Sequence, residues 1–205
     1  MTNSGFNPIP LIIIIALVVV IGGGFVFMWV YCMKIAKKQY KNMFIRDTKE
    51  KWARGNSAPE NAEHTVMFDT GMKRGTENAS YMKEIEVTSF DGLKMKGEYF
   101  DFGHDKAAII MAGRAETCKY CYYFADLYQK NNYNIIVVDP RAAGLSEGYT
   151  TGAGMLEGKD LAAWINLVHE QFKIDHFVIH GICIGSVAAI YVASEHNPYV
   201  DAIVL

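Results

Sequence analysis

The feature that most constrains this chain is an uncharged apolar run near its N-terminus. Residues 9–33 read IPLIIIIALVVVIGGGFVFMWVYCM. About 20 apolar residues suffice for a helix to cross a bilayer with its backbone polar groups satisfied internally. The alternatives are a cleaved signal peptide, which needs a basic start and a small-residue cleavage site, and a core helix, which would be amphipathic. The run fits neither, so residues 1–33 are expected to form an N-terminal transmembrane helix.

The charges that follow this run predict its orientation. Eight Lys and Arg lie between Lys34 and Arg54, where the acidic residues are Asp47 and Glu50, and nothing basic precedes the run. Flanks rich in Lys and Arg stay cytoplasmic. We therefore expect a single-pass protein of the cell membrane, with its N-terminus outside and the remainder in the cytoplasm. Residues 34–80 are expected to be a basic juxtamembrane segment, able to lie on anionic lipid, and a polar linker with little structure from residue 56 onward.

The composition of residues 81–205 argues against several kinds of site. This part has ten basic and sixteen acidic residues, which gives no support for nucleic-acid binding. Cys32, Cys118, Cys121 and Cys183 show no spacing typical of a secreted disulfide framework, so a reducing compartment is expected. The pair Cys118-x-x-Cys121 lies inside a predicted helix, and two cysteines cannot complete a tetrahedral zinc site. We expect neither a metal nor a cofactor.

Strand and helix patterns alternate along residues 84–205, which is typical of βαβ units and a mainly parallel sheet. Two alternating runs flank Asp91-Gly92 and predict an antiparallel hairpin at one edge of that sheet. The sequence thus predicts an α/β fold. The expected strands are 84–90, 93–102, 106–111, 134–138, 176–180 and 201–205, and the expected helices are 116–130, 154–172 and 186–195.

The segment most informative for chemistry is Gly181-Ile182-Cys183-Ile184-Gly185, between a predicted strand and a predicted helix. The pattern G-x-S-x-G in that setting forms a nucleophile elbow, a sharp turn that exposes the nucleophile at a helix N-terminus. Small residues two before and two after the nucleophile let strand and helix approach. A thiolate can replace the serine, because it is intrinsically nucleophilic. Cys183 could also be a small buried residue without a chemical role.

Together with the elbow, three further features resemble the α/β-hydrolase superfamily, in its lysophospholipase and serine-aminopeptidase-like branch. Gly113-Arg114-Ala115-Glu116 follows a predicted strand where that family places an oxyanion-hole loop. Asp139 to Ser146 is similar to the family's D-x-R-G-x-G-x-S loop, with Ala142 in place of the first glycine. The predicted helix 154–172 occupies the place of the helix before the nucleophile strand.

The resemblance implies roles for a few residues. Cys183 would be the catalytic nucleophile, as in dienelactone hydrolases and polyhydroxyalkanoate synthases. The N–H groups of Arg114 and Ile184 would form the oxyanion hole, and Gly181 and Gly185 would be the elbow glycines. In this family the catalytic acid and then the histidine follow the nucleophile. Since the sequence stops at Leu205, we expect residues 81–205 to be the N-terminal part of the domain, incomplete at the C-terminus and without those two groups.

The implied function is a membrane-anchored hydrolase of carboxylic esters or other acyl compounds. It would act through an acyl-enzyme, with the lipid bilayer and a small-molecule or lipid ester as its partners. Two alternatives remain open: a truncated or non-catalytic protein with this fold, and an acyltransferase on the same fold, because fold alone does not decide among them.

Overall fold

The computed structural model describes residues 7–46, 62–114 and 116–205. The chain divides into two compact units, of which the second begins at Phe44. The first unit consists of helix α1 (Ile9–Phe44) up to Met43. Among the described residues, α1 is the one helix long and apolar enough to span a membrane, with a mean hydropathy of 3.1 over its most apolar window. A signal sequence near the N-terminus can meet the same criteria of length and hydropathy.

The second unit is built on a six-stranded mixed sheet in the order β1-β2-β4-β3-β5-β6. Its strands are β1 (Met82–Thr88), β2 (Lys94–Phe100), β3 (Lys106–Met111), β4 (Asn134–Val138), β5 (His176–Gly181) and β6 (Val200–Val204). The hairpin β1–β2 is antiparallel and pairs antiparallel with β4, and every pairing from β4 to β6 is parallel. The predicted α/β fold with an antiparallel hairpin at one edge is therefore confirmed.

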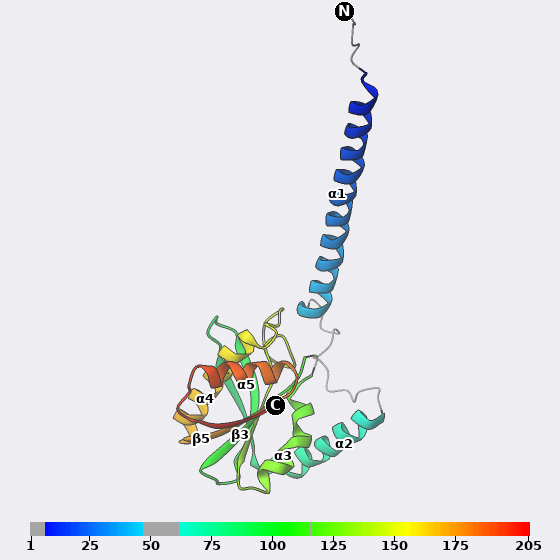
Figure 1. Ribbon diagram of the computed structural model, residues 1–205. Coiled ribbons are helices and arrows are strands. Elements are labelled where there is room, and N and C mark those ends of the chain that lie inside the picture. Colours follow the sequence, from blue (N-terminus) through cyan, green and yellow to red (C-terminus); the bar gives the residue numbers. More distant parts are fainter. Residues whose placement is uncertain (1–6, 47–61, 115) are drawn as a thin grey trace, which may run out of the picture. The chain divides into compact units, whose positions relative to one another are not determined.

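Helices cover both faces of this sheet (Figure 1). They are α2 (Ala62–Glu77), the short 3₁₀ helices η1 (Ala79–Tyr81) and η2 (Cys118–Cys121), α3 (Tyr122–Gln129), α4 (Met155–Phe172) and α5 (Ile184–Ser194). On one face Trp164 of α4 and Ala188 of α5 pack on Ile109 of β3. On the other face Tyr122 and its neighbours pack on Ile110. Successive side chains of a strand point to opposite faces, and both faces of this sheet are covered. After their first residues, Lys106 and Asn134, β3 and β4 are therefore apolar.

The expectation of a linker with little structure from residue 56 onward is wrong for residues 62–77, which form α2. Residues 56–61 lie outside the described part of the chain. The polar composition of α2 hides its packing, because its contacts depend on two glycines. A Cβ at Gly71 would lie 2.8 Å from the backbone nitrogen of Tyr123, and one at Gly75 would overlap the ring of Tyr122. These glycines let α2 lie close against α3.

The start of the predicted helix 116–130 also differs. It begins as η2 and becomes α-helical only at Tyr122. The carboxylate of Asp139 accepts a hydrogen bond from the N–H of Cys118 at 2.7 Å. This contact with the loop after β4 satisfies an N–H group in the first turn that has no partner within the helix.

Candidate active site

Cys183 lies in the turn between β5 and α5, with φ 55° and ψ −110° and its side chain exposed. A positive φ is uncommon for any residue except glycine, because the Cβ then crowds the backbone. Such strained residues persist only where the surrounding structure holds them, and they concentrate at functional sites. The strain at Cys183 is therefore a feature that the neighbouring residues must maintain.

The two glycines around Cys183 provide that support. A Cβ at Gly181 would overlap the backbone of Gly185, and a Cβ at Gly185 would lie 2.5 Å from the carbonyl oxygen of Met111. The N–H of Ile182 donates to the same Met111 carbonyl at 3.1 Å, which ties the turn to the end of β3. Only glycine fits at either position, because strand and helix approach to backbone contact.

The loop after β3 lies directly beside this turn. A Cβ at Gly113 would be 3.3 Å from the Cβ of Cys183. The side chain of Glu116 holds the loop by accepting the N–H of Gly113 at 2.9 Å. Arg114 is exposed and follows Gly113 directly. On the other side of Cys183, the N–H of Ile184 donates no hydrogen bond to any described residue, as is usual for the first residue of a helix. That the N–H groups of Arg114 and Ile184 converge near the sulfur stays a prediction.

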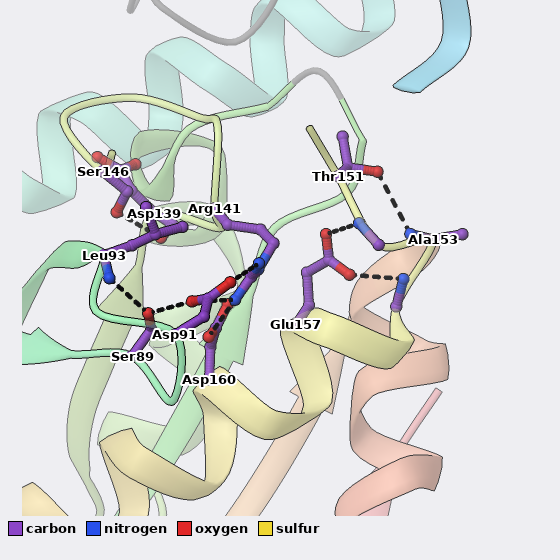
Figure 2. A network of polar contacts seen from close by, with 12 residues as sticks. Ser89, Asp91, Leu93, Asp139, Arg141, Ser146, Thr151, Ala153, Glu157 and Asp160 are labelled. Atoms are coloured by element: carbon purple, nitrogen blue, oxygen red, sulfur yellow. Dashed lines mark hydrogen bonds and ion pairs between the residues drawn. The ribbon is translucent and has the colours of Figure 1, made fainter. Parts of the chain in front are cut away.

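Buried charged groups organise the loop after β4, and Figure 2 shows the contacts of Arg141 with Asp91 and Asp160. The carboxylate of Asp139 accepts the N–H groups of Cys118 and Leu145 at 2.7 and 2.8 Å, and burial raises the pKa of Asp139. Arg141 donates to Asp160 at 2.8 Å, and Arg141 and Asp160 are both buried. These contacts fix the backbone of the loop and leave its charged groups occupied, so we assign the loop a supporting role.

A second loop at the same edge depends on Glu157, which is not among the residues expected at the site. Its carboxylate accepts the N–H groups of Gly152 and Gly154 at 2.7 and 2.8 Å (Figure 2). A Cβ at Gly154 would lie 2.8 Å from the carbonyl oxygen of Ile184, so this loop borders the start of α5. A glutamate three residues after the residue that caps a helix is the available sequence signal, because it can reach back to the free N–H groups.

The remaining candidate groups are occupied elsewhere. The Nδ1 atom of His180 lies 3.0 Å from the hydroxyl of Tyr128, and burial lowers the pKa of this histidine. Its ring also packs on Phe124. Cys118 and Cys121 are buried, and burial raises the pKa of both thiols. Within the described residues there is no group of three or more His, Cys, Asp or Glu that could hold a metal ion.

Comparisons with known proteins agree with this architecture. A family model described as alpha/beta hydrolase fold matches residues 109–205. The thiohydrolase aneE of Aspergillus aculeatus is 32% identical over 79 residues, which cover 38% of this chain and 24% of aneE. The uncharacterized protein YqkD of Bacillus subtilis is 29% identical over 141 residues, or 61% of this chain and 45% of YqkD.

Among solved structures, the esterase Pf2001 of Pyrococcus furiosus is similar with a TM-score of 0.54 and 28% identity, over 59% of this chain and 49% of that protein. The chain thus spans at most about half the length of these three relatives. The strand order, the antiparallel hairpin, the matched family model and these likenesses together show that this chain has the α/β-hydrolase fold.

Proposed function

We propose that this protein is a membrane-anchored hydrolase of carboxylic esters or related acyl compounds, in which Cys183 takes up the acyl group. The observation that carries the proposal is the backbone at Cys183, where an exposed thiol sits at positive φ between Gly181 and Gly185 at the start of α5. A similar solved structure is named an esterase and a relative is named a thiohydrolase, which supports acyl compounds as the substrate class.

In the proposed step, the thiolate of Cys183 attacks the acyl carbonyl carbon and forms a C–S bond. The carbonyl oxygen becomes an oxyanion, which the N–H groups of Ile184 and Arg114 would stabilise, as would the N-terminus of α5. The C–O bond to the alcohol then breaks, and the leaving alkoxide takes a proton from water. Hydrolysis of the resulting thioester requires a general base, and we assign none of the described histidines to that role.

The anchor in this proposal is α1. Its apolar length and the basic residues from Lys34 onward support a single span with the second unit on the cytoplasmic side. The substrate would then be a small molecule of the cytoplasm or a lipid ester of the inner leaflet.

The test compares two reactions of the same thiol. Attack on an ester carbonyl develops an oxyanion, whereas alkylation by iodoacetamide does not, so an oxyanion hole should accelerate only the first reaction. Acylation by p-nitrophenyl acetate and alkylation by iodoacetamide would be followed at Cys183 by mass spectrometry, in a Cys32→Ser background. We expect the ratio of the two rates to exceed that of glutathione by at least about tenfold, since one oxyanion-hole donor contributes about 10²–10³.

Two controls make the result specific. The Cys183→Ala protein should show no acylation at this position. Cys118 and Cys121, which are buried, should stay unmodified as long as the protein is folded. A rate ratio equal to that of glutathione would mean that Cys183 is an ordinary exposed thiol, and the enzymatic role of this turn would then be abandoned.

A further inference from the structure

A cavity of about 380 Å³ opens beside the turn that carries Cys183. The cavity adjoins this turn at Ile182 and the loop after β3 at Arg114. Its other walls include Phe124 of α3 and two residues of α2, Met67 and Phe68. Helix α2, which lies in the segment expected to be a linker, therefore borders the candidate site.

Helix α2 is held rigidly enough to act as a wall. The ring of Phe68, which is buried, lies with its centroid 4.9 Å from that of Tyr120 in η2. One turn further on, the close contact at Gly71 brings α2 to the backbone of α3. The guanidinium of Arg74 forms an ion pair with Asp126 of α3. A wall fixed by packing, backbone contact and an ion pair keeps its shape when the cavity is filled.

The lining combines polar and apolar side chains. His64, Arg114 and Glu116 are polar, whereas the larger part of the lining is apolar or aromatic: Met67, Phe68, Tyr120, Phe124 and Ile182. Apolar surface binds apolar groups and penalises charged ones, because a charge loses its hydration there. We infer that α2 forms one wall of an acyl-binding pocket, so that the preferred substrates are esters with an apolar acyl chain of several carbons. This inference rests on the proposed attack by Cys183.

The experiment uses the whole protein, in a Cys32→Ser background, and two reagents that differ only in their alkyl chain. Methyl and octyl methanethiosulfonate both react with the thiolate of Cys183, forming a mixed disulfide and releasing methanesulfinate. We expect the octyl reagent to react at least tenfold faster than the methyl reagent, relative to the same two reactions of glutathione. The longer chain would be held in the cavity during the attack.

Two substitutions on α2 form the matched test. Met67→Trp should fill the cavity and abolish the octyl preference. Val66→Trp adds the same side chain at the neighbouring position, which is 65% exposed and does not line the cavity, so the octyl preference should persist. If the unmodified protein shows no octyl preference, or if Met67→Trp retains it, the pocket is wrong.

The outcomes separate this inference from the proposed function. Disulfide formation involves no carbonyl group and needs no oxyanion hole. An octyl preference without any acceleration of ester acylation would therefore support the pocket and overturn the proposed catalysis. Accelerated acylation without an octyl preference would overturn the pocket and leave the catalysis standing.

Discussion

At the scale of single residues, Ala142 shows how this chain departs from the loop that it resembles. Ala142 has φ 59° and is fully buried, at the position where the similar family loop has glycine. A residue with a Cβ costs roughly 1–2 kcal/mol in the left-handed region. The hydrogen bonds of Asp139 and Ser146 hold the loop in this conformation, so the strain is maintained by its neighbours.

The substitutions Ala142→Gly and Ala143→Gly should differ in effect. Both remove one buried methyl group and both increase the freedom of the unfolded chain, but only Ala142 has a positive φ. Ala142→Gly is therefore expected to leave the protein about 1–2 kcal/mol more stable than Ala143→Gly. Urea unfolding of the two variants in detergent measures this difference. Equal free energies of unfolding would mean that the backbone at Ala142 is not strained.

At the scale of helices and strands, the central strands of the sheet could be predicted from the sequence, whereas helix α2 could not. The predicted strands 106–111 and 134–138 match β3 and β4, because a strand buried on both faces is apolar throughout and is bounded by polar residues. The turn at Cys183 was placed because G-x-C-x-G has a distinct spacing between a strand and a helix. Both signals are local in the sequence.

Helix α2 and the cavity beside it left no such local signal. Two glycines within 16 residues argue against a helix by propensity, and they make sense only beside Tyr122 and Tyr123, about 50 residues later. The role of Glu157 was missed for a related reason, since its partners are N–H groups of a loop whose shape the sequence did not reveal. The structural features that could not be predicted, such as α2 and the role of Glu157, depend on contacts between segments that are distant in the sequence.

The packing of α2 predicts a large effect of a single truncation. Phe68 is buried beside Tyr120 of η2. Phe68→Ala should therefore lower the free energy of unfolding by about 3–5 kcal/mol, the usual range for removing a buried aromatic ring. Val66→Ala, on the exposed side of the same helix, should cost less than about 0.5 kcal/mol. Urea unfolding measures both. A small effect at Phe68 would show that α2 is docked only loosely.

The ion pairs of Arg141 differ in burial and should differ in energy. The side chain of Asp160 is 1% exposed, whereas that of Asp91 is 39% exposed. Asp160→Asn removes the buried counter-charge of the guanidinium, leaving only the partly exposed Asp91, and is expected to cost about 3–5 kcal/mol. Asp91→Asn, on the solvent side, should cost less than about 1 kcal/mol. Similar losses for the two variants would contradict this ranking.

The ion pair between Arg141 and Asp91 predicts how the stability of the protein changes with pH. The hydrogen bond from Arg141 lowers the pKa of Asp91, so the contribution of Asp91 is complete above its ordinary pKa and is lost as the pH falls through its folded value. The Tm of the unmodified protein should exceed that of Asp91→Asn near neutral pH. The gap should close on acidification from about pH 6 to about pH 2. A gap that stays constant would show that the carboxylate is not held by Arg141.

At the scale of the whole molecule, the first residues of the second unit pair with loops of the same unit. Ile45 pairs with Thr150, and the N–H of Arg46 donates to the carbonyl of Tyr149 at 2.6 Å. These partners belong to the loops after β4, which reach the start of α5 at Gly154. Ile45 and Arg46, at the start of the second unit, are therefore tied to loops that border the turn at Cys183.

The proposed anchoring and orientation lead to the last prediction. A helix that spans the bilayer resists extraction with alkaline carbonate, whereas a peripheral protein is released, so this protein should stay in the membrane pellet.

The orientation needs a separate test, with one exposed cysteine on each side of the membrane. Cys118 cannot serve because it is buried. Cys183 is exposed in the second unit, and Asn3→Cys in a Cys32→Ser background would report on the N-terminus. The positive charges from Lys34 onward, which begin within the last turns of α1, should keep the second unit inside. A membrane-impermeant maleimide should therefore label the Asn3→Cys variant at its N-terminus in intact cells, and Cys183 only after the membrane is permeabilised. Labelling of Cys183 in intact cells would reverse the orientation, and release by carbonate would rule out the span.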